Sequence, residues 1–230
     1  MLSCYVINAC SLKKPNALQL LITKLCNFAI DVAAVTETWL NSNVSSCELT
    51  ISSYKLFRRD REGRKGGGLC IFVKDSITAD SIIIPTANSE SKSDHNMHEN
   101  LYLKLVKNNQ VYLFLLVYHP PRAKYNSSTR LGRLANDVEH LTDLYPNAIV
   151  YLTGDFNQIN TSVFLSDTGM HQTVTEPIPE VKIHLICLSL TDLMRLTFPL
   201  FKPACALITV LSLLIVLRLN LPPYRTKLPS

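Results

Sequence analysis

The chain has 230 residues, of which 23 are Lys or Arg and 18 are Asp or Glu, so its formal net charge at pH 7 is +5. This length suits one domain with a core of its own. The charge is uneven, because residues 1–177 hold 17 basic and 16 acidic residues whereas residues 178–230 hold 6 and 2. Residues 1–177 are therefore almost neutral, so the overall charge says little about what this part of the chain binds. The seven cysteines lack the spacing of a zinc site.

The first half of the chain predicts strands with one helix between them. Residues 4–9 ("CYVINA") form a short apolar strand, and residues 16–28 place apolar side chains at helical spacing after Pro15. Residues 31–40 are a second buried strand, with polar side chains only towards its end. Residues 53–77 hold two strands separated by a charged turn and three glycines, which is the pattern of a β-hairpin.

The second half continues the alternation of strands and helices. A short strand is predicted at residues 81–85, a pair of strands at 100–118, a helix at 130–145 and a buried strand at 147–158. Strands outnumber helices, and the helices fall between groups of strands. This order indicates an α/β fold of two or more packed layers.

Polar side chains close four of the predicted strands at their C-terminal ends, where α/β folds usually carry their sites. They are Asn8, Glu37, Tyr118 and the pair Asp155 and Asn157. Polar groups at the end of apolar strands are costly unless they are paired or bind an ion. Two carboxylates could hold a divalent cation that prefers oxygen ligands, while the amides and the phenol could contact a phosphate. Taken singly, each residue could equally be a strand-end cap.

Three motifs, "TETWL", "VYHPP" and "GDFN", stand in an order and at a spacing that resemble the endonuclease/exonuclease/phosphatase superfamily. The resemblance is closest to the apurinic-endonuclease-like domain of non-LTR (LINE-type) retrotransposons. "RRDREGRKGGGLCIFVK" is similar to the basic hairpin of that group, and "NACSLKKP" with "LQLLI" to its first strand and helix. The resemblance spans residues 1–177 and implies a four-layer α/β sandwich, in which two mixed β-sheets pack face to face with helices outside.

The resemblance also implies a role for each strand-end residue. Glu37 would be the principal ligand of Mg²⁺ (or Mn²⁺), assisted by Asn8. Asp155 would position or deprotonate the attacking water, Asn157 would orient that water, and Tyr118 would contact the scissile phosphate. The implied reaction hydrolyses one DNA phosphodiester and leaves a 3′-hydroxyl that can prime reverse transcription. The metal and the polar donors would stabilise the charge on the pentavalent phosphate.

The basic hairpin is expected to bind DNA, the partner that the resemblance implies. Its cations would neutralise phosphates without reading the base sequence, and they are Arg58, Arg59, Arg61, Arg64 and Lys65. A solvated hairpin tip is the alternative. A full-length relative would carry a reverse transcriptase domain, no small-molecule cofactor is implied, and the expected location is the nucleus or the cytoplasm.

Two further elements of the family are absent from their expected place near the end of the chain. They are an aspartate in a Leu-Asp-Leu context and a Ser-Asp-His triplet. The chain has "SDH" at Ser93–His95, but this triplet precedes the strands at 100–118 and is interpreted as a coincidence. We therefore expect the final strands to be missing and the nuclease activity to be impaired, and whether the chain is an active enzyme stays open.

Codon degeneracy offers an explanation for the leucine-rich segment 178–230, which has no glycine. The residues can be translated back into their possible codons, and these codons can be read in the frame that starts at the third base of each. In that frame the codons of residues 178–181 can encode Thr-Arg-Gly, and those of residues 184–187 can encode Leu-Asp-Leu. In the same frame, residues 189–194 can encode Thr-Asn-Arg-Pro-Asp and residues 206–211 can encode Ser-Asp-His-Cys-Ala. The sequence thus predicts a nuclease-like domain at 1–177 and an apolar tail at 178–230 that is read out of frame.

A membrane helix is the competing interpretation of the apolar run Pro203–Leu217. Its length falls short of the ~20 residues needed to cross a bilayer, and an extension towards the N-terminus would include Lys202. A transmembrane anchor is therefore not expected. The functional alternatives are a catalytically dead nucleic-acid-binding remnant, another phosphoesterase of the superfamily that acts on lipids or nucleotides, and a membrane-associated protein.

Overall fold

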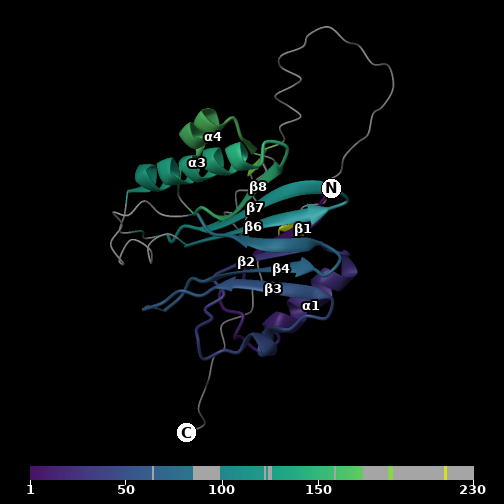
Figure 1. The fold of residues 1–230 in the computed structure, drawn as a ribbon. Coiled ribbons are helices and arrows are strands. Elements are labelled where there is room, and N and C mark those ends of the chain that lie inside the picture. Colours follow the sequence, from purple (N-terminus) through teal and green to yellow (C-terminus); the bar gives the residue numbers. More distant parts are fainter. Residues whose placement is uncertain are drawn as a thin grey trace.

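Two β-sheets pack face to face, with helix α1 outside one sheet and helices α3 and α4 outside the other (Figure 1). The structure is a computed structural model. It describes residues 1–63, 65–84, 99–121, 123, 126–157 and 159–172, together with the backbone of 186–188 and 215–216. The order of layers is helix, sheet, sheet, helices, as the sequence predicts.

The first sheet has the strand order β11-β1-β2-β4-β3. Its strands are β1 (Cys4–Asn8), β2 (Val32–Thr36), β3 (Tyr54–Arg59), β4 (Leu69–Lys74) and β11 (Ile215–Val216). Strands β1 and β2 are parallel and are connected through α1 (Ala17–Asn27), whereas β4 runs antiparallel to β2 and β3. Helix α1 buries Ala17, Leu21 and Leu25, which repeat every four residues and so lie on one face of the helix.

The second sheet has the strand order β5-β6-β7-β8-β10-β9. Its strands are β5 (Thr78–Ile82), β6 (Glu99–Lys107), β7 (Gln110–Tyr118), β8 (Ile149–Asp155), β9 (His171–Gln172) and β10 (Ile186–Leu188). Strands β7 and β8 are parallel and are connected through α3 (Ser127–Leu144). The remaining helices are α4 (Ser162–Thr168) and the short 3-10 helix η1 (Ser46–Leu49).

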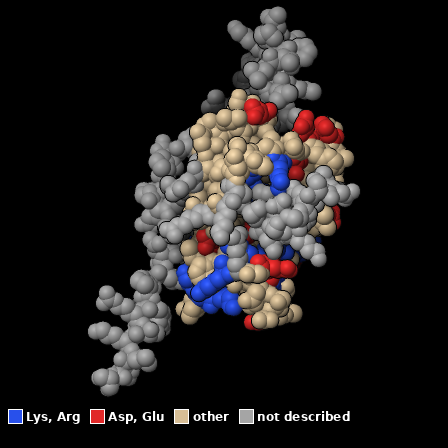
Figure 2. Space-filling model, turned by 90° about the vertical axis from the view of Figure 1, so that its left-hand side faces the viewer, with Lys and Arg blue, Asp and Glu red and all other residues tan. Residues whose placement is uncertain are grey.

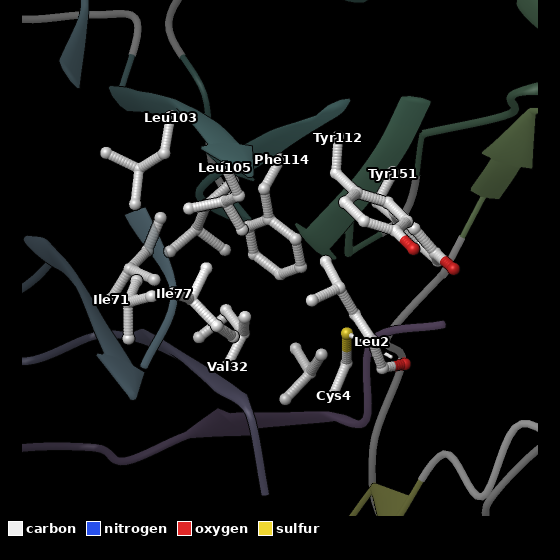
Figure 3. Packing of buried hydrophobic residues seen from close by; sticks show 14 of the residues in the cluster. Leu2, Cys4, Val32, Ile71, Ile77, Leu103, Leu105, Tyr112, Phe114 and Tyr151 are labelled. Atoms are coloured by element: carbon white, nitrogen blue, oxygen red, sulfur yellow. Dashed lines mark hydrogen bonds between the residues drawn. The ribbon is translucent and has the colours of Figure 1, made fainter. Parts of the chain in front are cut away.

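The main core lies between the two sheets (Figure 3). Phe114 and Leu105 of the second sheet belong to the same buried cluster as Val32 and Ile71 of the first. Alternate residues of β7 face opposite ways, so Leu113 and Leu115 belong to the cluster under α3 whereas Phe114, Leu116 and Tyr118 face the other sheet. The ring of Tyr118 therefore ends the inter-sheet core at the C-terminal edge of β7.

Some elements differ from those that the sequence predicts. The strand expected at 81–85 lies at Thr78–Ile82 instead, because pairing with β6 sets its position, and the neighbouring Ile83 is 87 % exposed. Helix α4 was not predicted, because its seven residues are too few for a clear helical period. The final strands were predicted to be missing, and the described residues of the tail form two short strands, β10 beside β8 and β11 parallel to β1.

The other predictions for the tail concern residues outside the described ones. This holds for three of the four motifs of the shifted frame, for residues 184–185 of the fourth, and for the apolar run 203–217 apart from the backbone of 215–216. No helix within the described part of the chain is both long and apolar enough to span a bilayer.

Candidate active site

The C-terminal ends of four strands meet at one edge of the sandwich and bring the predicted residues together. Asn8 ends β1 opposite Thr36, and Glu37 follows Thr36 directly. On the other sheet, Tyr118 ends β7 opposite Asp155 at the end of β8. Because each pair of strands is parallel, each sheet delivers two polar side chains to the same edge.

Glu37 is one of the residues that join the two sheets by polar contacts. The hydroxyl of Tyr118 donates to Oε1 of Glu37 at 2.8 Å, across the sandwich. The indole Nε1 of Trp39 donates to Oε2 at 2.9 Å, and Nδ2 of Asn8 lies 3.5 Å from Oε1. Glu37 has φ 52°, the left-handed region that costs a non-glycine residue free energy, so the surrounding contacts hold this carboxylate in a strained position.

Asp155 is the second carboxylate, and it is bound by the same asparagine. Nδ2 of Asn8 donates to Oδ2 of Asp155 at 2.8 Å, and the backbone N–H of Asn157 donates to Oδ1 at 3.0 Å. The side chain of Asn157 turns back and donates to the backbone carbonyl of His119 at 2.6 Å. All five predicted strand-end residues therefore form one continuous hydrogen-bonded group, in which Asn8 contacts both carboxylates.

Burial sets the protonation of two members of this group. Asp155 is only 6 % exposed, and this burial raises its pKa from the ordinary value of 3.8 to about 6, although its hydrogen bonds with Asn8 and Asn157 oppose the change. Burial, and next the neighbouring Glu37, raise the pKa of Tyr118 well above its usual range. Tyr118 is consequently a neutral phenol that donates its proton to Glu37.

The raised pKa of Asp155 predicts how the stability of the metal-free protein depends on pH. Between about pH 4 and pH 6 the folded chain keeps a proton that the unfolded chain releases, so the free energy of unfolding falls as pH rises, by about 3 kcal/mol over this window. Denaturant unfolding in EDTA at pH 4.5 and pH 7 measures about 2 kcal/mol of this loss, which Asp155→Asn should remove. Equal losses in the wild type and in the variant would contradict the prediction.

The donor atoms fit a hard divalent cation. Among the described residues no cluster of three or more His, Cys, Asp and Glu side chains that could hold a metal ion occurs, so the oxygen atoms available here are those of two carboxylates and of the amide of Asn8. An ionised carboxylate has about four lone-pair positions, and the contacts given above occupy three positions on Glu37 and two on Asp155. The all-oxygen set with open positions suits Mg²⁺, which keeps several waters.

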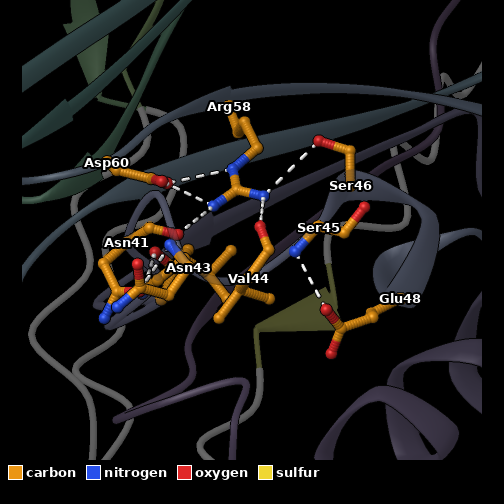
Figure 4. A network of polar contacts seen from close by, with 10 residues as sticks. Asn41, Asn43, Val44, Ser45, Ser46, Glu48, Arg58 and Asp60 are labelled. Carbon is orange, nitrogen blue, oxygen red and sulfur yellow. Dashed lines mark hydrogen bonds and ion pairs between the residues drawn. The ribbon is translucent and has the colours of Figure 1, made fainter.

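The basic residues of the β3–β4 hairpin differ in the contacts that their side chains make. Arg58 is ion-paired with Asp60 at 2.5 Å and donates to the backbone carbonyls of Asn41 and Val44, so it fastens the hairpin to the neighbouring loop (Figure 4). Arg59 donates to the carbonyl of Asn100 at 2.8 Å. Both guanidinium groups thus have structural contacts that the sequence did not predict.

Arg61, Arg64 and Lys65 complete the predicted basic set. Arg61 is nearly buried and pairs with Glu99, Arg64 lies outside the described residues, and Lys65 is exposed. Figure 2 shows lysine and arginine side chains in separate groups on this face of the molecule, the larger one low on the face and another nearer the top, with acidic side chains beside them. DNA binding by these residues stays a prediction, and Arg58, Arg59 and Arg61 also have contacts within the protein.

A cavity of about 670 Å³ opens beside Glu37. Its lining comes from the residue after β2, from the hairpin, and from the end of β7 with the segment that follows: Glu37, Arg61, Lys65, Gly66, Gly67, Tyr118, Pro120 and Pro121. Sequence reasoning missed Trp39 and Glu99 as parts of this site. The letter W in "TETWL" was a usable signal for Trp39, whereas Glu99 comes from the first position of β6 and has no local signal.

Three solved structures have the same fold as this chain. The endonuclease domain of TRAS1, a telomere-specific non-LTR retrotransposon, is 13 % identical with a TM-score of 0.58, covering 82 % of this chain and 85 % of that one. The Bacteroides thetaiotaomicron mannosyl-6-phosphatase is 12 % identical with a TM-score of 0.59 (81 % and 85 % covered). TDP2 of D. rerio, in complex with a single-strand DNA product, is 17 % identical with a TM-score of 0.53 (80 % and 82 % covered).

These proteins share the sandwich fold of the endonuclease/exonuclease/phosphatase superfamily, and the fold predicted from the sequence is confirmed. No family model and no curated protein matches the chain by sequence. At 10–17 % identity the likeness concerns the fold, so the chemistry has to be argued from the residues of the site.

Proposed function

We propose, from the premise that the chain has the fold of the endonuclease/exonuclease/phosphatase superfamily, that it is a divalent-metal-dependent nuclease that hydrolyses DNA phosphodiesters. The observation that carries the proposal is the position of Asn8, whose amide contacts Glu37 of its own sheet and Asp155 of the opposite sheet. Two carboxylates held together in this way, beside an open cavity, are a costly arrangement unless a cation or a reacting proton uses it.

The residues of the site divide the work of hydrolysis between them. Glu37, assisted by the Oδ1 of Asn8, would hold Mg²⁺ or Mn²⁺, which would supply charge stabilisation on the phosphate. Asp155 is the only other carboxylate in the group and would take the proton of the attacking water, for which a pKa of about 6 is suitable. Asn157 would orient this water, and Tyr118 would donate to a phosphate oxygen.

The biological setting is also part of the proposal. A likeness to the TRAS1 endonuclease domain supports a retrotransposon nicking enzyme, whose full-length relatives would carry a reverse transcriptase domain and act in the nucleus or the cytoplasm. The single-strand DNA in the TDP2 structure supports DNA as the substrate class.

We further propose that residues 1–177 are the nuclease domain and that 178–230 are read out of frame, which sequencing of the coding DNA tests directly.

Slow turnover is expected, because the chain has no Ser-Asp-His triplet at the position that the family resemblance requires. Loss of a phosphate-binding general acid or base typically costs a factor of about 10²–10⁴ in rate. The test is nicking of supercoiled plasmid by the full chain at high enzyme concentration. Open circles should accumulate in Mg²⁺ and not in EDTA. Salt-sensitive DNA binding without any nicking would instead identify a catalytically dead nucleic-acid-binding remnant.

A further inference from the structure

The guanidinium group of Arg61 lies inside the cavity of the candidate active site and not at the solvated tip of the hairpin. Its side chain is 8 % exposed, and it lines the cavity together with Glu37 and Tyr118. The guanidinium carbon stands over the ring of Tyr118, 5.4 Å from the ring centre. A cation in this place costs free energy unless it has partners or a ligand.

Glu99 fixes the direction of this guanidinium. Nε and Nη2 of Arg61 both contact Oε1 of Glu99, whose side chain is 7 % exposed. The other oxygen of Glu99 accepts a hydrogen bond from the backbone N–H of Gly68 at 2.6 Å. The carboxylate is therefore held from two sides, and Arg61 has little freedom to leave.

The glycine run of the hairpin makes room for this pair. Gly67 has φ +67°, and a Cβ at this position would overlap the guanidinium carbon of Arg61. A Cβ at Gly68 would lie 2.5 Å from Oγ1 of Thr38. All three glycines of "KGGG" have positive φ, which favours glycine, and at Gly67 the side chain of Arg61 also leaves no room for a Cβ.

The guanidinium of Arg61 keeps hydrogen-bonding capacity for a ligand. Nε donates to Glu99 and Nη2 completes the ion pair, but the buried Nη2 has no hydrogen-bond partner, and among the described residues Nη1 makes no hydrogen bond either. Lys65, whose ammonium lies 6.0 Å from the centre of the Trp39 ring, lines the same cavity. Two cationic side chains thus border the space next to Glu37, and one of them is held rigidly.

We propose that Arg61 and Lys65 form a phosphate-binding subsite, in which Nη1 of Arg61 donates to a non-bridging oxygen of the substrate phosphate, and that Glu99 is the residue that positions Arg61. The proposal rests on the function proposed above. In it, Arg61 makes the phosphate contact that the histidine of the Ser-Asp-His triplet would make in the family that the chain resembles. A charge-assisted donor that is already oriented stabilises a phosphate more than a mobile surface cation does. Because the Arg61–Glu99 pair is neutral overall, it acts at short range and adds little to long-range attraction of DNA.

The experiment follows the side-chain Nε–Hε signal of Arg61 by NMR during titration of the full chain with the dinucleotide TpT, in EDTA. Arg61→Lys identifies the signal, and we expect TpT to shift it while the signal of Arg133 on α3 stays in place. Gly67→Ala keeps every charge but displaces the guanidinium, so it should also weaken TpT binding, by about tenfold. In the nicking assay Arg61→Lys should lower the rate about 10- to 100-fold, whereas the control Arg133→Lys should stay within about twofold.

Glu99→Gln separates a positioning role from a simple electrostatic one. If Glu99 only neutralises Arg61, its loss should tighten TpT binding, whereas a positioning role predicts about tenfold weaker binding. An Arg61 signal that ignores TpT in a protein that nicks DNA overturns the subsite and leaves the nuclease function standing. A shifted signal in a protein that never nicks DNA supports the subsite and rejects the nuclease function, and no response in either assay rejects both.

Discussion

Glu37→Gln is expected to abolish Mg²⁺-dependent nicking, with a loss of at least about 10³-fold in rate. The substitution keeps the shape of the side chain and an oxygen that can accept from Tyr118 or Trp39, so the fold should persist. It removes the negative charge that would hold the cation. The measurement is the initial rate of open-circle formation from supercoiled plasmid, compared at several Mg²⁺ concentrations.

A matched control separates the metal site from a general effect of charge. Glu139→Gln makes the same change on the exposed face of α3, away from the site, and should leave the rate within about twofold. DNA binding in EDTA, including its salt dependence, should be the same in all three proteins because phosphate contacts supply it. Nicking by Glu37→Gln at the wild-type rate would remove Glu37 from the mechanism.

Gly154→Ala is expected to cost about 3 kcal/mol or more of unfolding free energy. Gly154 has φ +141°, which L side chains rarely adopt, and a Cβ there would overlap the backbone carbonyl of Val117 on the paired strand β7. The residue directly precedes Asp155, so a shift of β8 that relieves the overlap would also move this carboxylate. Urea unfolding monitored by circular dichroism gives the loss, and the nicking rate should fall with it.

Gly132→Ala provides the opposite result in the same assay. Gly132 lies inside α3 with nothing within 4 Å of a new Cβ, so the substitution should raise the unfolding free energy by about 0.5–1 kcal/mol. If both variants changed stability equally, the tight approach between β7 and β8 would not be the cause of the Gly154 effect.

The site residues that could be predicted from the sequence are those that lie at the C-terminal end of an apolar strand. Asn8, Glu37, Tyr118 and Asp155 each close an apolar run, and parallel pairing brings such ends to one edge whatever the details of packing. The α/β layering follows from the same alternation of strands and helices.

The parts that could not be predicted depend on the register between distant segments. Glu99 meets Arg61 because β6 begins beside the hairpin, and no local pattern in "HENLYLKL" indicates this neighbour. The hairpin arginines look alike in the sequence, yet one is paired with Asp60, one caps a carbonyl and one enters the cavity. Their contacts differ because the three side chains lie on different faces of the β-hairpin and meet different neighbouring residues there.

The site draws half of its polar group from each sheet, and this division links chemistry to the way the sandwich closes. Asn8 and Glu37 belong to one sheet and Tyr118 and Asp155 to the other, and two hydrogen bonds between the sheets together with the apolar core set their separation. A methyl group lost from that core, far from any reacting atom, can widen the gap by a fraction of an ångström. In a copy that accumulates substitutions, catalysis would therefore fade through loosened packing well before any of the reacting side chains is itself replaced.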